Sequence, residues 1–255
     1  MTTLASVAAV LRCFSEERTE LTVTDVAALL PAPKSTVSRL LRAMRDAGFI
    51  ESIGATKRYR PGLMLFEAGN VYRRASSLVA RADEVVKAVS GQVGHSGYVS
   101  IRAGHDVVGL TYHPGSHVLR VATPIGRRLA AFASATGRTL LARLRDEEVK
   151  ALYPTLPMPP SPNAPQSVDE LLARLAKVRQ EGFAESNDEA NRGVAAIAVA
   201  VGDPETREAV SLCVTFPSST ITQGERDAII DGLRAGARRI AAILGDDPDY
   251  NTRTH

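Results

Sequence analysis

The stretch PKSTVSRLLRAMRDAGF, residues 33–49, most constrains what this chain can fold into. Helical spacing gathers its apolar side chains on one side and its arginines and small hydroxyls on the other. The apolar side holds Val37, Leu40, Leu41 and Met44. The polar side holds Ser35, Arg39, Arg42 and Asp46. Because only one side can pack on other helices, we expect the basic side to face outward, with Gly48 ending the helix.

The segments around this helix predict a known order of elements. A first helix is expected over about residues 3–14, and a second over 25–30 with Thr24 as its cap. The prolines of 31–33 force a turn before the basic helix. FIES and KRYR then form a β-hairpin around Gly54. This is the order of a winged helix-turn-helix, whose second motif helix enters the major groove of DNA.

The charge distribution agrees with a nucleic-acid surface. The 255 residues carry a net charge of only +3, but seven basic and two acidic residues lie between Pro33 and Arg60. A solvated helix face is the alternative, and it is less favoured because the neighbouring elements agree. Arg can bridge guanine O6 and N7, whereas Lys and hydroxyls more often hold phosphates. The predicted DNA-contacting residues are Lys34, Ser35, Thr36, Ser38, Arg39, Arg42, Lys57 and Arg58.

The rest of the chain predicts a connecting helix and a second, α+β domain with an antiparallel sheet flanked by helices. Expected strands are GYVSIRA, DVVGLTYH, HVLRVAT, GVAAIAVAV and EAVSLCVTF. Expected helices include 77–90, 135–144, 146–152, one capped by Ser167 and a last one capped by Thr222 with Glu225. The predicted domains are 1–61 (winged helix-turn-helix), 62–76 (linker helix), 77–247 (effector binding and oligomerisation) and 248–255 (tail).

Four segments carry a resemblance to a known family. LPAPKSTVSRLLRAMRDAGFIES, KRYRPGLMLFEAG, FASATGRTLLA and EGFAESNDEANRGVAAIAVAV together resemble the IclR-type bacterial transcription regulators, in order along nearly the whole chain. The resemblance implies an N-terminal winged helix-turn-helix, a linker helix involved in dimerisation, and a C-terminal effector-binding domain with a GAF-like sheet. It also implies homodimers, or dimers of dimers, acting on palindromic promoter sites of a catabolic or metabolic operon.

The segment SATGR points to one edge of an effector pocket. Ser134 is expected to cap a helix, so that the N–H groups around Ala135, Thr136 and Gly137 attract a carboxylate. An ordinary capped helix is an equal alternative from spacing alone. The family resemblance favours binding, because this segment is similar to part of the family's effector pocket.

The resemblance implies four further pocket positions, Ser186, Ala196, Cys213 and Thr215. The family often has an acidic residue at the first, a cysteine at the second and serines at the last two. This chain departs at three of the four toward smaller or less polar groups, which favours a small organic acid with an apolar body, an aromatic acid included. His113 is a further candidate for a hydrogen bond to the effector.

Metal binding and catalysis are less favoured. His113 and His117 flank a PGS turn and could meet as zinc ligands, but no carboxylate or cysteine cluster completes a set. GHSGY only superficially resembles a nucleophile elbow, since Tyr98 replaces its last glycine. Cys213 is interpreted as core filler rather than a redox sensor. We therefore predict no metal, no cofactor and no catalytic residue.

Three classes of function are to be distinguished. A ligand-responsive DNA-binding regulator is the leading hypothesis, and an enzyme acting on a small organic acid, with an N-terminal interaction module, is the alternative. A nucleic-acid coating protein would need aromatic stacking platforms, yet aromatic residues make up only 5% of the chain. MTTLASVAAVLRCF has no basic region and no continuous apolar run, and the chain has two cysteines, so no membrane association and a cytoplasmic location are expected.

Overall fold

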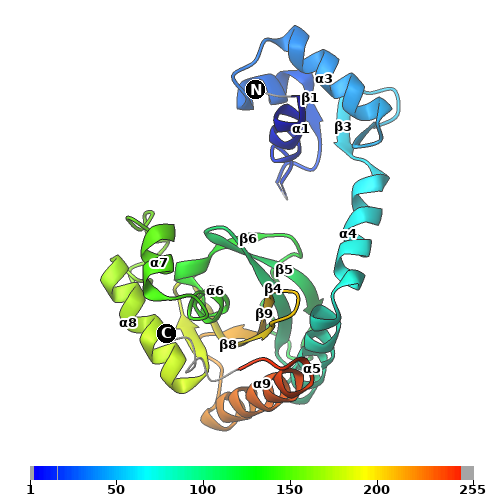
Figure 1. Cartoon of the computed structure of the whole chain (residues 1–255). Coiled ribbons are helices and arrows are strands. Elements are labelled where there is room, and N and C mark those ends of the chain that lie inside the picture. The colour runs from blue at the N-terminus through cyan, green and yellow to red at the C-terminus, as the bar shows by residue number, and fades with distance from the viewer. Residues whose placement is uncertain (1–2, 16, 248–255) are drawn as a thin grey trace. The chain divides into compact units, whose positions relative to one another are not determined.

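A computed structural model describes residues 3–15 and 17–247 of the chain. Its contacts divide the chain between Ala75 and Ser76 into two compact units (Figure 1). The predicted tail, residues 248–255, lies outside the described part. Among the helices that the structure describes, none combines the length and apolar character needed to cross a bilayer.

The N-terminal unit is a winged helix fold with its own small core. Its helices are α1 (Thr3–Leu11), α2 (Val23–Leu29), α3 (Lys34–Asp46) and α4 (Leu63–Ala75). Its strands are β1 (Leu21–Thr22), β2 (Ile50–Ser52) and β3 (Arg58–Pro61), paired antiparallel in the order β1-β3-β2. The core is formed by Val10, Cys13, Leu21, Val26, Val37, Leu41, Met44 and Ile50. Helix α4 contributes no buried residue.

The caps of α2 and α3 are set by local hydrogen bonds. Thr22, and not the predicted Thr24, caps α2: its Oγ1 accepts from the Asp25 N–H at 3.2 Å, while the Asp25 carboxylate accepts from the Thr22 N–H at 2.8 Å. Asp25 determines this start, because a capping box needs the acidic residue three positions after the cap. After α3, Gly48 takes a left-handed conformation (φ 81°) and the Phe49 N–H bonds to the Met44 carbonyl at 2.9 Å.

The passage from the hairpin into α4 is closely packed at Gly62. The Gly62 N–H donates to the Phe49 carbonyl at 2.9 Å. A Cβ at this position would lie 2.2 Å from the Gly48 carbonyl oxygen, which is part of the backbone and cannot swing aside. The end of α3 and the start of α4 are therefore in direct backbone contact.

The C-terminal unit is built on one antiparallel sheet of order β6-β5-β4-β9-β8-β7. Its strands are β4 (Ser96–Ala103), β5 (Asp106–His113), β6 (Arg128–Ala130), β7 (Ala184–Asn187), β8 (Val194–Asp203) and β9 (Glu208–Pro217). Its helices are α5 (Ser77–Val93), the 3₁₀ turn η1 (Ala131–Ala133), α6 (Ala135–Leu141), α7 (Asp146–Leu152), α8 (Val168–Glu181) and α9 (Gln223–Leu244). The predicted α+β class is confirmed.

The two faces of this sheet carry different side chains and different helices. Along β8, Ile197, Val199 and Val201 join the core formed with α5 and α9. Ala196, Ala198 and Ala200 alternate with them and join the core formed with η1, α6, α7 and α8. Figure 1 shows α5 and α9 on one side of the sheet and α6 on the other. We call these the large-residue face and the small-residue face.

Two predicted features of the C-terminal unit differ from the structure, and one strand is additional. HVLRVAT is not a strand: the His117 N–H bonds to the Gly94 carbonyl at 3.1 Å, which turns this segment toward the end of α5, and β6 pairs with β5 instead. The helix predicted over 135–144 ends at Leu141. Strand β7 was not predicted, because AESN is too short and polar to show an apolar alternation.

Two glycine substitutions test the packing at the start of α4. Gly62→Ala is expected to lower the free energy of unfolding, because its Cβ must displace backbone. Gly69→Ala, in α4 with nothing within 4 Å of its Cβ, is expected to raise it by about 0.5–1 kcal/mol. Urea unfolding followed by circular dichroism measures both. Equal effects of the two substitutions would contradict the packing at Gly62.

Candidate DNA interface and effector site

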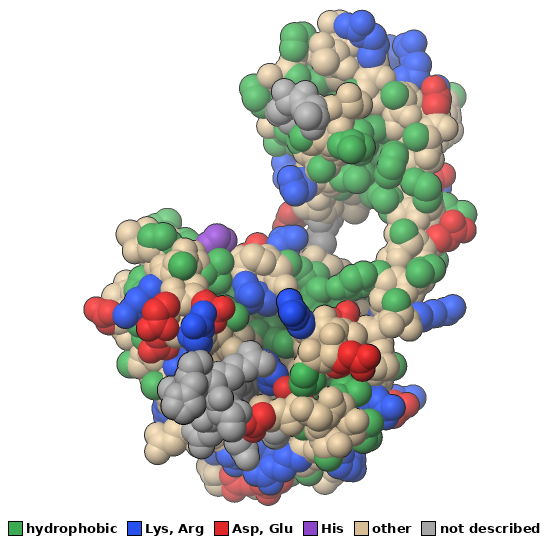
Figure 2. Space-filling model, viewed as in Figure 1, with side chains coloured by type: hydrophobic (Ala, Val, Ile, Leu, Met, Phe, Trp, Pro, Cys, Tyr) green, Lys and Arg blue, Asp and Glu red, His purple; other side chains and the backbone are tan. Residues whose placement is uncertain are grey.

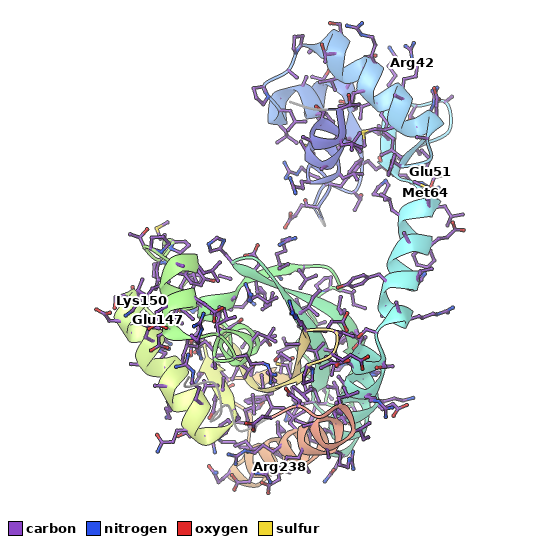
Figure 3. All side chains as sticks on the ribbon, in the orientation of Figure 1. Arg42, Glu51, Met64, Glu147, Lys150 and Arg238 are labelled. Atoms are coloured by element: carbon purple, nitrogen blue, oxygen red, sulfur yellow. The ribbon has the colours of Figure 1, made fainter. Side chains whose placement is uncertain are left out.

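Helix α3 is anchored by its apolar side and leaves its basic side uncovered within the N-terminal unit. Val37, Leu41 and Met44 are buried. Lys34, Arg39 and Arg42 are exposed, and none has an ion-pair partner among the described residues. Figure 3 shows Arg42 extending from α3 away from the body of this unit, and Figure 2 shows Lys and Arg side chains gathered over this helix.

The first turn of α3 presents hydrogen-bond donors from its backbone and its hydroxyl side chains. Its N-cap is Pro33, which makes no side-chain hydrogen bond to the helix. The Thr36 and Val37 N–H groups bond to the Pro33 carbonyl at 3.0 Å. The Ser35 and Thr36 side chains are exposed and Ser38 is half-buried. The start of a 13-residue helix without a side-chain cap presents backbone N–H groups and a positive dipole end, which suits a phosphate.

The basic residues of the hairpin differ in whether they have an ion-pair partner. Lys57, in the turn, is exposed and has no ion-pair partner in the described part of the chain. Arg58 lies in β3, where its Nη1 is 3.5 Å from a Glu20 carboxylate oxygen. Arg60 is likewise 3.5 Å from Glu51. The two predicted DNA-contacting residues Lys57 and Arg58 therefore differ in their availability for a phosphate, because Arg58 already has a carboxylate nearby.

Four predicted effector positions lie on the small-residue face of the sheet. The strand register places Ser186 beside Ala196 and Ala196 beside Thr215. Cys213, two residues before Thr215, lies in the next row on the same face, beside Ala198. Residues from β7, β8 and β9 are thus brought together, although up to 29 positions separate them in the sequence.

Cys213 contacts the start of α6. Its thiol is hydrogen-bonded to Thr136, and complete burial raises the pKa of the Cys213 thiol to about 11. At neutral pH the residue is a protonated thiol, which is a poor nucleophile and a poor redox sensor. The contact places Thr136 against the same face as the four sheet positions.

The first turn of α6 is only partly available to a ligand. The Gly137 N–H donates to the Ser134 Oγ at 3.0 Å, as the predicted cap requires. The N–H groups of Ala135 and Thr136 meet no acceptor within the described residues. Gly137 is explained by packing, because a Cβ there would lie 2.1 Å from the Ala131 carbonyl oxygen.

His113 does not lie with the other predicted effector residues. It pairs with Gly97 in the sheet, and a Cβ at Gly97 would lie 2.5 Å from Val86 of α5, so both positions belong to the large-residue face. The His113 Nε2 lies 2.7 Å from the Asp83 carboxylate of α5. We therefore leave His113 out of the candidate effector site. It does not meet His117 either.

Two side chains that were not predicted also belong to the small-residue face. Ser96 lies beside Thr215, and its buried Oγ has no hydrogen-bond partner in the described chain. The Tyr98 hydroxyl accepts from the Thr123 N–H at 2.6 Å and donates to the Val121 carbonyl at 3.3 Å. Burial raises the pKa of Tyr98, so this hydroxyl stays protonated. It attaches the segment after β5 to the sheet.

A buried ion-pair network fixes α6 against the β7–β8 connection. Arg138 and Glu189 are 3% and 7% exposed and are joined by two hydrogen bonds. Arg138 Nη2 also donates to the Glu185 carbonyl at 2.7 Å, and Arg174 of α8 lies 3.2 Å from Glu189. Arg138 lies in the segment SATGR and Glu189 in NDEANRG. The sequence spacing alone does not show that two residues 51 positions apart form an ion pair.

The fold defines a class of protein, since a winged helix with an unpaired basic face belongs to DNA-binding regulators. The chain matches the IclR helix-turn-helix domain over residues 3–54 and the C-terminal domain of the bacterial transcriptional regulator IclR over residues 72–242. It belongs to the IclR family of bacterial transcriptional regulators, with a helix-turn-helix and a C-terminal effector domain. It is a regulator and not an enzyme.

Individual proteins agree with this membership. The HTH-type transcriptional regulator XynR of Escherichia coli (strain K12) is 28% identical over 241 residues, covering 92% of this chain and 94% of XynR. The structure of an IclR transcriptional regulator from Silicibacter sp. TM1040 matches with a TM-score of 0.85 at 23% identity, covering 98% of this chain and 100% of that one. An IclR homologue from Microbacterium hydrocarbonoxydans, in complex with 4-hydroxybenzoate, matches with a TM-score of 0.80 at 22% identity, covering 96% and 99%.

The buried network makes a prediction about stability. Glu189→Ala removes the carboxylate between two arginines and leaves Arg138 buried without its partner, so the free energy of unfolding should fall by about 3–5 kcal/mol. Asp106→Ala, which removes the partner of the exposed Arg128, should cost no more than about 1 kcal/mol. Chemical unfolding of both variants checks the difference. A loss at Glu189 as small as that at Asp106 would contradict the structural role.

Proposed function

We propose that this chain binds palindromic promoter DNA through α3 and the β2–β3 turn. The observation that carries the proposal is the basic side of α3, where Lys34, Arg39 and Arg42 have no carboxylate partner in the described chain. An arginine that is free of ion pairs can offer two of its guanidinium nitrogens to guanine O6 and N7. The promoter would belong to a catabolic or metabolic operon, in the cytoplasm.

The other predicted contacts have supporting roles in this proposal. Ser35, Thr36 and the uncapped start of α3 hold phosphates, which set the position of the helix on the duplex. The half-buried Ser38 adds a hydroxyl at the edge of the contact. Lys57 reaches the neighbouring backbone. Arg58 contacts DNA only if it exchanges Glu20 for phosphate.

Homodimerisation through the N-terminal unit explains a palindromic site. Helix α4 buries none of its own side chains and exposes several large apolar ones. They are Leu63, Met64, Phe66, Val71 and Tyr72. Exposed apolar side chains concentrated on one helix mark an interaction surface, and a second copy would supply the two-fold symmetry of paired half-sites. Association of two dimers stays a prediction.

We further propose a small organic acid as the effector, on the small-residue face. The Ala135 and Thr136 N–H groups and the unpartnered Ser96 Oγ are donors for a carboxylate. Ser186 and Thr215 flank this region, and Ala196 and Cys213 supply apolar surface. The 4-hydroxybenzoate complex of the Microbacterium homologue, and the stacked rings of Tyr98 and Tyr112 on this face, support an aromatic acid.

The effector acts by favouring one arrangement of the protein over another. A ligand that binds two arrangements equally shifts neither, so the effector must make different contacts in the two. The segment held by the Tyr98 hydroxyl is a candidate for such a difference, because it lies over the small-residue face at Val121 and Thr123.

The DNA proposal predicts a loss of binding without a loss of stability. Arg39→Ala should weaken binding to the DNA flanking the chain's own gene by about 1–3 kcal/mol, because it removes a base contact. Thermal stability should change by less than about 0.5 kcal/mol, since the side chain is exposed and unpaired. Fluorescence anisotropy at several salt concentrations measures affinity, which should fall steeply with salt.

Arg12→Ala is the matched control, because Arg12 is an exposed arginine of the same unit outside α3 and the hairpin. It should leave affinity almost unchanged. DNA binding that survives both Arg39→Ala and Arg42→Ala would refute the proposed interface.

The effector proposal predicts stabilisation by an aromatic acid. 4-Hydroxybenzoate at one hundred times its dissociation constant should add about 2.7 kcal/mol, and its methyl ester should add far less because it lacks the carboxylate. Thermal melts measure both, and Thr215→Val should reduce the shift while Thr220→Val, an exposed threonine, should not. Stabilisation by glyoxylate alone would contradict an effector with an apolar body.

A further inference from the structure

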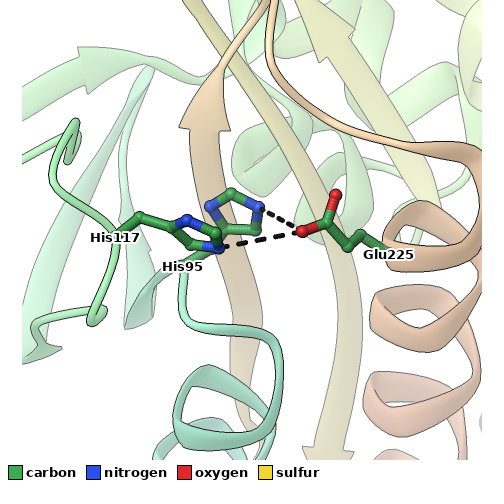
Figure 4. Close-up of side chains that lie close together, drawn as sticks. All are labelled: His95, His117 and Glu225. Carbon is green, nitrogen blue, oxygen red and sulfur yellow. Dashed lines mark ion pairs between the residues drawn. The ribbon is translucent and has the colours of Figure 1, made fainter.

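Three side chains of types that can bind a metal meet on the large-residue side of the sheet, away from the proposed effector site. His95 lies just before β4, His117 lies in the segment after β5, and Glu225 lies in the first turn of α9 (Figure 4). Glu225 Oε1 is 4.0 Å from His95 Nε2 and 3.7 Å from His117 Nε2. One ligand atom from each residue lies within 4.8 Å of the other two.

We propose that His95, His117 and Glu225 bind a divalent transition-metal ion of the zinc class. Two imidazoles and one carboxylate are a ligand set that Zn²⁺ accepts in proteins, with a fourth position left for water. Tetrahedral coordination at about 2.0–2.2 Å places ligand atoms about 3.3 Å apart. The two distances to Glu225 therefore need to close by less than about 1 Å.

The carboxylate is already oriented for this role. Glu225 Oε2 accepts the Thr222 N–H at 2.8 Å and the Thr222 hydroxyl at 2.7 Å, as part of the cap of α9. Its other oxygen, Oε1, is the one directed at the two histidines. Outer partners such as Thr222 fix ligands in metal sites.

The imidazole of His95 provides a second observation that points to a metal, independent of the distances between the three side chains. Its side chain is only 4% exposed, and its Nε2 is buried with no hydrogen-bond partner among the described residues. A buried nitrogen without a partner costs free energy, which coordination to a metal would recover.

The exposed side chain of His117 explains how an ion can enter the cluster and how the distances between the ligand atoms can shorten. Its side chain is 45% exposed, and Glu225 is 30% exposed, so an ion can reach the cluster from solvent. Binding through His117 Nε2 exchanges a 3.2 Å hydrogen bond to the Val93 carbonyl for a coordination bond. Because His117 lies outside the strands, it can move toward Glu225 without disturbing the sheet.

Calorimetric titration of Zn²⁺ into the tag-free full-length chain, previously stripped with a chelator, tests the site. His117→Ala and Glu225→Gln should each raise the dissociation constant by at least about tenfold. The controls are His105→Ala, an exposed histidine outside the cluster, and Glu170→Gln, the residue at the equivalent position of the α8 cap. Both controls should bind Zn²⁺ like the unmodified chain.

Circular dichroism melts show whether each variant is folded, and if one fails to fold the other decides. Absence of Zn²⁺ binding to the unmodified chain, or unchanged affinity in a folded cluster variant, would overturn the proposal. Zn²⁺ that is lost equally in the controls would do the same. None of these readouts uses DNA or an effector, so the result is independent of the proposed function.

Discussion

The C-terminal unit depends on a difference in side-chain size between the two faces of its sheet. On one face, Ile197, Val199, Leu212 and Val214 pack against α5 and α9. Full burial of each such side chain contributes about 1.5–3 kcal/mol, so this face contributes a large part of the stability of the unit. On β7, β8 and β9 the opposite face carries alanines, serines and Cys213, which fill less space, while Tyr98 and Tyr112 stack on it from β4 and β5. The candidate effector contacts thereby lie on the face with the smaller strand side chains.

The arginines of the chain differ in whether they have a carboxylate partner. Arg143, Arg179 and Arg226 of the C-terminal unit each have a carboxylate oxygen within 2.8 Å. Arg39 and Arg42 of α3 have no such partner in the described chain. A buried arginine without a carboxylate partner would cost free energy as an isolated charge. An exposed arginine without a partner costs little, because water solvates it. Arg39 and Arg42 are thereby left with positive charge on the exposed side of α3, while Arg45 of the same helix is paired with Asp46 at 2.7 Å.

Local patterns predicted the helices and the winged helix, because caps and apolar periodicity act within a few residues. Ser167 and Thr222 both cap the helices that their spacing predicted. Strand faces were harder: His113 was grouped with Cys213, but the register beside Gly97 turns it toward α5. The network of Arg138 and the cluster of His95 with Glu225 were missed because they join distant segments, which no local spacing records.

The glycine contact at the start of α4 has a mechanical consequence. Gly62 touches the backbone of Gly48 and bonds to Phe49, so no side chain or solvent layer lies between the two helix ends. The two helices are therefore coupled directly through their backbones. A reorientation of α4 would therefore move the residues that follow α3, and with them the angle at which that helix is presented.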